Sequence, residues 1–91
     1  MIAKRLQVHG RVQGVAYRHW ARETATRLGL AGWVRNVADG TVEALVEGDT
    51  AAVEEMLRAC RLGPPGASVS LIHEDLVEPE ELVGFVVRPG R

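Results

Sequence analysis

The chain has 91 residues, of which 46% are hydrophobic and 25% charged, and its formal net charge is −1. This length suits one small domain with one core, so we expect residues 1–91 to form a single domain. The balanced charge argues against a dedicated binder of nucleic acid or of an anionic membrane surface, because such proteins usually carry a basic excess. A local basic site inside a neutral protein remains compatible with these numbers.

Cysteine content and hydropathy bear on the compartment. Cys60 is the only cysteine, so no internal disulfide can form and a reducing compartment is the default. No apolar stretch approaches the length of a membrane span. The N-terminal segment alternates from its start and lacks the apolar core of a signal peptide. We therefore expect a cytoplasmic protein without membrane association.

The first third of the chain reads as a strand, a loop and a helix. Residues 4–9 alternate between apolar and polar side chains, which predicts a half-buried strand, and a loop over residues 10–16 follows. From Tyr17 the apolar residues recur at helical spacing, which predicts a helix that ends at Gly29. The apolar stripe of this helix consists of Tyr17, Trp20, Ala21, Thr24, Ala25 and Leu28.

A β-hairpin is predicted next. Two strand-like runs, residues 33–37 and 41–47, flank the pair Asp39-Gly40, which is a strong hairpin signal. In the second run, one apolar side alternates with a polar side that carries Glu43 and Glu47, and Leu45 interrupts that polar side. We expect Trp20 and Trp33 to lie in the core.

The remaining chain reads as a helix and two strands. Asp49 or Thr50 caps the helix, and Gly63-Pro64-Pro65 ends it. Residues 68–76 predict a strand, and residues 84–88 predict a short last strand. The buried stripe of the helix consists of Val53, Met56, Leu57 and Cys60.

The predicted order is therefore β-α-β-β-α-β with a short extra C-terminal strand. Two helices are too few to cover both faces of a sheet, so the economical packing puts both on one face of a mainly antiparallel sheet. This is an α+β, ferredoxin-like sandwich. The fold alone assigns no function, because many unrelated activities share it.

The start of the first helix lacks a capping side chain. In the stretch "GRVQGVAYR", residues 10–18, no Ser, Thr, Asp or Asn precedes the helix, and Gly14 is the best available cap. Either water and Gly14 satisfy the first N–H groups, or these groups bind an anion together with Arg18. An arginine in the first turn opposes the helix dipole by roughly 0.3–1 kcal/mol, and a bound phosphate would reverse that cost. The residues alone favour the anion site only slightly.

Two motifs in this order resemble the acylphosphatase family. The first is carried by Gly10, Val12, Gln13, Gly14, Val15, Tyr17 and Arg18, and the second by Gly32, Trp33, Val34, Asn36, Asp39, Gly40, Val42 and Glu43. The likeness covers nearly the whole chain, including the strand at residues 84–87. Departures are the pair Ala16-Tyr17, where larger or aromatic residues are common, and the tail at residues 88–91, which extends past the usual strand end.

The resemblance implies a ferredoxin-like enzyme that hydrolyses acyl phosphates to a carboxylate and inorganic phosphate. It implies no metal and no cofactor, a small acyl phosphate as substrate, and inorganic phosphate as product and inhibitor. We also expect a monomer. Arg18 and Asn36 are the implied catalytic residues: the guanidinium of Arg18 binds phosphate and Asn36 positions the attacking water. The backbone N–H groups of the phosphate-binding loop are those of Gln13, Gly14, Val15, Ala16, Tyr17 and Arg18.

Two other functions compete with this one. A non-catalytic phosphate-binding or interaction module could use the same scaffold. An RNA-binding ferredoxin-like domain would stack bases on aromatic residues of its central strands, and the first strand here has none. His9, His19 and His73 show no metal-ligand spacing and are interpreted as surface residues. Cys60 is interpreted as a core residue rather than a nucleophile.

Overall fold

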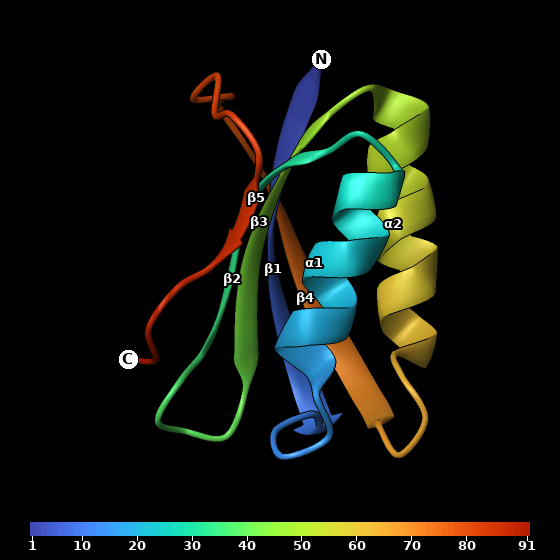
Figure 1. Ribbon diagram of the computed structural model, residues 1–91, viewed down its shortest axis with the longest axis vertical. Helices are drawn as coiled ribbons and strands as arrows, with labels where there is room; N and C mark the ends of the chain where they lie inside the picture. The colour runs from blue at the N-terminus through green and yellow to red at the C-terminus, as the bar shows by residue number, and fades with distance from the viewer.

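A computed structural model describes residues 1–91 and confirms the predicted ferredoxin-like order with its extra strand (Figure 1). The sheet has five strands in the order β4-β1-β3-β2-β5, and only the β2–β5 pair is parallel. Both helices cover the same face of this sheet. The elements are β1 (Ile2–Arg11), α1 (Tyr17–Arg27), β2 (Ala31–Asn36), β3 (Val42–Gly48), α2 (Thr50–Leu62), β4 (Ser68–Val77) and β5 (Phe85–Val87).

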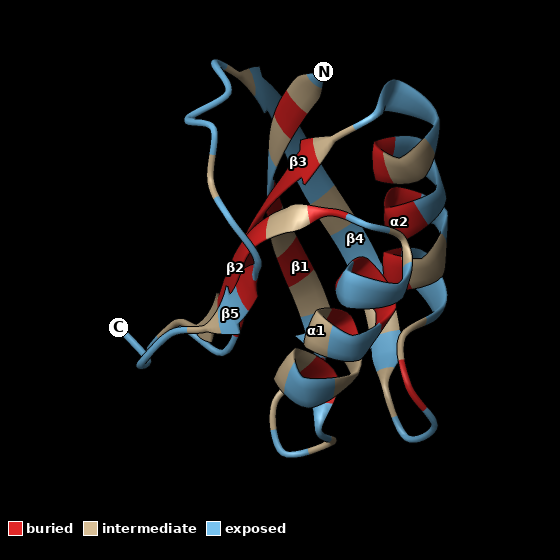
Figure 2. Ribbon diagram, turned by 45° about the horizontal axis from the view of Figure 1, so that its top comes forward, coloured by how far each residue is buried: buried red, intermediate tan, exposed pale blue.

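The core lies between the helices and the sheet, where buried residues of α1 and α2 face the strands (Figure 2). All four residues of the stripe predicted for α2 are buried, as expected. In α1 the stripe is buried at Tyr17, Ala21, Thr24 and Ala25. Trp20 and Leu28 are partly buried and pack against the edge of the core. The helical period therefore identified the faces that the two helices bury.

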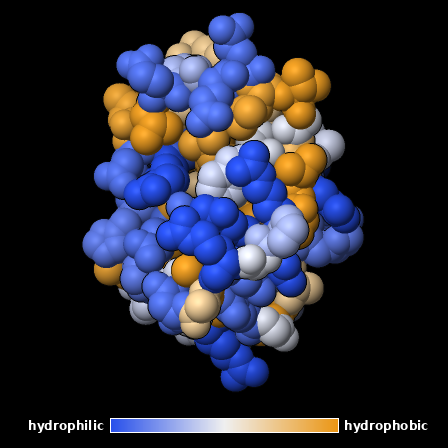
Figure 3. Space-filling view, turned by 90° about the vertical axis from the view of Figure 1, so that its left-hand side faces the viewer, coloured by the Kyte–Doolittle hydropathy of each residue, from blue (hydrophilic) through white to orange (hydrophobic).

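The side of the sheet away from the helices is less exposed than the polar alternation of β3 predicts. Leu45 is 4% exposed and Glu47 only 2%. The carboxylate of Glu47 accepts the backbone N–H groups of Glu80 at 2.6 Å and Leu82 at 2.7 Å. The connection between β4 and β5 therefore covers this end of the central strand, and Glu47 satisfies its backbone donors. The sheet side of the molecule, on the left in Figure 1, has a mainly hydrophilic surface with separate hydrophobic patches (Figure 3).

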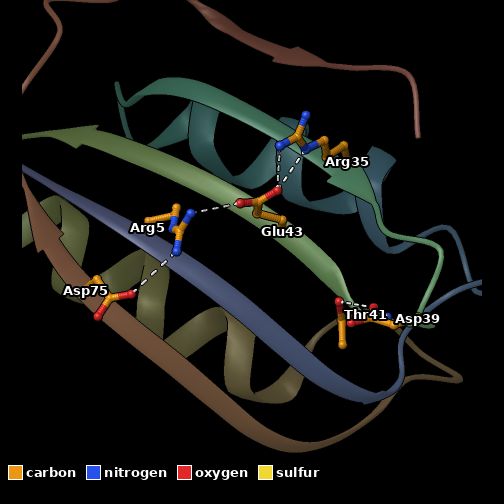
Figure 4. A network of polar contacts seen from close by, with 6 residues as sticks. All are labelled: Arg5, Arg35, Asp39, Thr41, Glu43 and Asp75. Atoms are coloured by element: carbon orange, nitrogen blue, oxygen red, sulfur yellow. Dashed lines mark hydrogen bonds and ion pairs between the residues drawn. The ribbon is translucent and has the colours of Figure 1, made fainter. Parts of the chain in front are cut away.

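An ion-pair network lies on the same side of the sheet (Figure 4). One carboxylate oxygen of Glu43 receives both Nε and Nη2 of Arg35 at 2.8 Å. The other oxygen lies 3.4 Å from Nη1 of Arg5, and Nη2 of the same arginine lies 3.9 Å from a carboxylate oxygen of Asp75. Glu43 is thus a paired, nearly buried carboxylate, and its role here is structural.

The surroundings of two aromatic side chains differ from the prediction in one detail each. Trp33 is buried, as predicted, but strand alternation places it on the side of the sheet away from the helices, outside the main cluster of core residues. Its ring contacts the guanidinium of Arg35 at 4.8 Å and that of Arg88 at 4.7 Å, an arrangement favoured by cation–π attraction. His9 is half-buried rather than on the surface, with its ring edge-to-face against His73 at 5.2 Å.

Tyr17 connects the start of α1 to the end of α2. The carbonyl of Cys60 would normally accept the N–H four residues later, but that residue is Pro64, which has none. The hydroxyl of Tyr17 donates to this carbonyl at 2.7 Å instead. Burial raises the pKa of Tyr17, so the hydroxyl keeps its proton, and burial raises the pKa of the Cys60 thiol to about 11. Cys60 is therefore the inert core residue that its position predicts.

Replacing Tyr17 by phenylalanine is expected to lower the free energy of unfolding by about 1–3 kcal/mol. The substitution keeps the ring but leaves the Cys60 carbonyl buried without a donor. Urea titration followed by circular dichroism measures the change, provided that the m-value is the same in both proteins. An unchanged midpoint would show that the hydroxyl contributes nothing to holding the two helices.

Candidate functional site

A pocket of about 310 Å³ opens at the N-terminal end of α1. It brings together Arg18, Asn36 and four more of the six loop residues predicted to bind phosphate: Gln13, Gly14, Ala16 and Tyr17. Val15 does not line it, because its side chain packs against the edge of the core near Gly66. Residues from the β1–α1 loop and from the end of β2, far apart in sequence, therefore share one pocket.

The loop before α1 leaves its backbone donors free. Ala16 is the N-cap residue, where Gly14 was expected, and no side chain caps the helix. Both residues have positive φ, 76° at Gly14 and 61° at Ala16, and such left-handed positions curl successive N–H groups into an anion-binding concavity. No backbone N–H of residues 13–18 donates to an acceptor within the protein. The left-handed alanine is a strained conformation that costs roughly 1–2 kcal/mol.

Gln13 fixes this loop against the hairpin that carries Asn36. Its side-chain amide donates to the carbonyls of Val37 and Thr41, both at 2.8 Å. The predicted Asp39-Gly40 turn is confirmed: one oxygen of Asp39 accepts the backbone N–H of Thr41 at 3.0 Å and its hydroxyl at 2.6 Å. These hydrogen bonds from Thr41 lower the pKa of Asp39. The sequence pattern did not indicate that the Gln13 side chain joins the loop to the hairpin.

Asn36 is the last residue of β2 and is half-buried. Strand alternation puts it on the same side as Val34, a core residue, and therefore on the helix side of the sheet. The tail runs beside it: the N–H of Arg91 donates to the Asn36 carbonyl at 3.0 Å, and the Arg91 oxygen accepts from Ala38 at 2.5 Å. The C-terminal tail therefore fixes the backbone of Asn36 at the end of β2 by hydrogen bonds.

The formally charged side chains around the pocket have one sign. Arg18 and Arg22 line it beside His19, and no Asp or Glu does. The Arg18 side chain makes no hydrogen bond or ion pair within the protein, so its donors are free for a ligand. No group of three His, Cys, Asp or Glu residues lies together in the chain as metal ligands would. Neither helix has the length and hydropathy that crossing a membrane requires.

Free N–H groups, an unpaired arginine and the absence of carboxylates give this pocket, on a ferredoxin-like scaffold, the chemistry that suits an oxyanion. Comparison with known proteins narrows this class. The model of the acylphosphatase family matches residues 4–87. The acylphosphatase of Acidiphilium cryptum is 62% identical over 88 residues, which span 97% of both chains. The chain belongs to the acylphosphatase family, as the two motifs predicted.

Solved structures of similar proteins have the same fold as this chain. The acylphosphatase of Bacillus subtilis has a TM-score of 0.95 and 36% identity, over 97% of this chain and 99% of the other. A structure described as full-length HypF in the phosphate- and nucleotide-bound form has a TM-score of 0.89 and 27% identity. That match covers 98% of this chain but only 12% of the HypF chain. The same scaffold therefore also occurs as a small part of a much larger protein.

Proposed function

We propose that the pocket between the 13–18 loop and Asn36 is the active site of this enzyme, which hydrolyses acyl phosphates to a carboxylate and inorganic phosphate. The observation that carries the assignment is the meeting of unpaired loop N–H groups, an unpaired Arg18 and Asn36 in one pocket without carboxylates. The non-catalytic alternative is less favoured, because the acylphosphatase relatives match this chain over nearly its full length.

The loop and Arg18 bind the phosphoryl group. Arginine offers a planar pair of donors that fits two phosphate oxygens, and the loop N–H groups add fixed partial positive charge. Both are in place before the reaction, so they stabilise the charge that develops on the phosphoryl oxygens in the transition state. Phosphoryl transfer depends mostly on such positioning and charge stabilisation, which explains a site without a catalytic acid.

Asn36 orients the attacking water. Its side-chain carbonyl accepts a hydrogen bond from water, which aims a water lone pair at phosphorus. The new bond joins the water oxygen to phosphorus, and the bond from phosphorus to the acyl oxygen breaks. The carboxylate leaves with that bonding pair and needs no general acid, because its conjugate acid has a pKa of about 4. An amide is too weak a base for the water proton, which passes to a phosphoryl oxygen of the substrate.

The direct test is release of phosphate from acetyl phosphate or benzoyl phosphate by the purified chain. We expect turnover that saturates with substrate and is competitively inhibited by inorganic phosphate. Saturable binding of phosphate without any turnover would instead support the non-catalytic module. We further propose that the enzyme works as a monomer in the cytoplasm, where its single, buried Cys60 needs no oxidising environment.

Excess chelator is expected to leave the rate unchanged. The site offers a single imidazole, that of His19, and no carboxylate or thiolate, whereas Mg²⁺ binds through carboxylates and Zn²⁺ through several imidazoles, carboxylates or thiolates. The measurement is kcat before and after extended dialysis against EDTA. Activity that is lost on dialysis and returns with one defined divalent ion would contradict a metal-independent mechanism.

A further inference from the structure

We propose that the C-terminal tail, residues 88–91, positions Asn36 for catalysis by holding the backbone at the end of β2. The inference rests on the proposed function, in which the side chain of Asn36 orients the attacking water. It starts from a segment that this function does not use and that lies beyond residues 4–87, which the family model matches. Arg91 is the positioning residue, and it acts through its main chain.

The main chain of Arg91 pairs with the end of β2. Its N–H donates to the Asn36 carbonyl at 3.0 Å, and its oxygen accepts the N–H of Ala38 at 2.5 Å. Arg91 thus bonds the residues on both sides of Val37, which is how one residue pairs with a neighbouring parallel strand. The tail therefore continues the parallel pairing of β5 with β2 as far as the last residue of β2 (Figure 1).

The tail lies on the side of Asn36 that would otherwise be an open edge of the sheet. On the other side Asn36 pairs with Val42 of β3. The register of β5 with β2 ends at Val34, two residues before Asn36, and the turn residues 38–40 are exposed. Strand ends with few partners and exposed hydrogen bonds open most readily. The two bonds from Arg91 are thus what keeps this side of the strand end closed.

The tail is itself held at its start, so that it can hold Asn36 in turn. The N–H of Arg88 donates to the Val34 carbonyl at 2.9 Å, and the Arg88 guanidinium lies 4.7 Å from the centre of the Trp33 ring. Pro89 follows and restricts the backbone by fixing its own φ. Arg91 is therefore the end of a short segment that is attached to β2 at both ends and has few free torsions between them.

A shift of the Asn36 backbone carries the side-chain amide with it. A displacement of about 1 Å of a group that aligns the reactants can cost up to about a hundredfold in rate. Phosphate is bound elsewhere, by Arg18 and the 13–18 loop, and the backbone hydrogen bonds of the tail go to β2 and its turn rather than to that loop. Loss of the tail contact should therefore lower kcat and leave the affinity for phosphate in place.

The test compares Arg91→Pro with Arg91→Ala, using acetyl phosphate as substrate. Both variants lose the guanidinium, but only proline also removes the N–H that the Asn36 carbonyl accepts. We expect Arg91→Pro to lower kcat about tenfold while KM and the inhibition constant for inorganic phosphate change about twofold or less. Arg91→Ala is the matched control, and its kcat should stay within about twofold of wild type, because its main chain is intact.

A double variant tests whether the tail acts through Asn36. Added to Asn36→Ala, Arg91→Pro should lower kcat by a further factor of about two or less, because the amide that the tail positions is already gone. A general loosening of the fold would instead lower kcat by the same factor in both backgrounds. Circular dichroism checks that each variant is folded, which is expected because residues 88–91 are exposed.

Equal kcat values in Arg91→Pro and Arg91→Ala would overturn the inference, and so would fully additive losses in the double variant. A strong rise in the inhibition constant for phosphate in Arg91→Pro would overturn it as well, since the tail would then act on the phosphate-binding loop. Failure of the proposed function has a different signature, because wild type itself would release no phosphate from acetyl phosphate.

Discussion

Arg18→Ala is expected to abolish nearly all phosphate release, with a loss of about a thousandfold or more in kcat/KM, while the fold survives. Removal of a single preorganised donor to a developing oxyanion costs about 10²–10³ in kcat, and here the lost group also carries the charge that binds the ground state. Arg18 makes no hydrogen bond or ion pair within the protein, so the substitution breaks no structural contact. Kinetics and circular dichroism on the same preparation measure both parts of the prediction.

A phosphate titration separates site binding from general effects. A ligand that binds only the native state adds RT ln(1 + [L]/Kd) to stability, or roughly 2.7 kcal/mol at a hundredfold excess over Kd. Phosphate and sulfate should therefore raise the melting temperature of wild type in a saturating way, and much less in Arg18→Ala. Arg27→Ala is the matched control and should behave as wild type. Because sulfate also stabilises proteins by exclusion from their surface, equal and non-saturating rises in all three proteins would refute the anion site.

Much of the fold could be predicted because it is encoded locally. The change from alternation to helical spacing at Tyr17 and the Asp39-Gly40 turn each depend on neighbouring residues, and both lie where they were expected. The burial of Glu47 could not be predicted in this way. Its partners, the N–H groups of Glu80 and Leu82, are 33 and 35 residues distant. A polar side chain in a strand gives no sign of which later segment will cross over it.

The candidate site shows the same division. The resemblance of the two motifs to the acylphosphatase family implied that Arg18, Asn36 and the loop belong to one site. The absence of a capping side chain already indicated free N–H groups at the start of the helix. The left-handed conformation of Ala16 could not be predicted from the residue type, because alanine rarely adopts this conformation. The contacts that hold the loop to the hairpin were equally hidden. Gln13 reaches Val37 and Thr41 over 24 and 28 residues, and only the folded chain brings these groups within 2.8 Å.

Hydrogen bonds from Gln13 join the 13–18 loop to the hairpin that carries Asn36. Because these bonds do not involve the side chain of Asn36, a substitution there can separate phosphate binding from the rate of hydrolysis. Asn36→Ala is expected to lower kcat about a hundredfold or more while the inhibition constant for inorganic phosphate changes by about threefold or less. The amide is proposed to orient water, and water that loses its alignment with phosphorus loses a large part of the rate. Phosphate itself is bound by Arg18 and the loop, which the substitution leaves in place.

The backbone of Asn36 should keep its position in this variant, because the contacts that fix it are made by its carbonyl with Arg91 and by the neighbouring carbonyl of Val37 with Gln13. Only the side chain is lost, so the change in kcat reports on the amide. Arg18→Ala is the converse variant and should weaken phosphate inhibition together with turnover. If Asn36→Ala instead raised the inhibition constant strongly and left kcat unchanged, Asn36 would be a phosphate ligand, and the attacking water would have to be oriented by another group of the pocket.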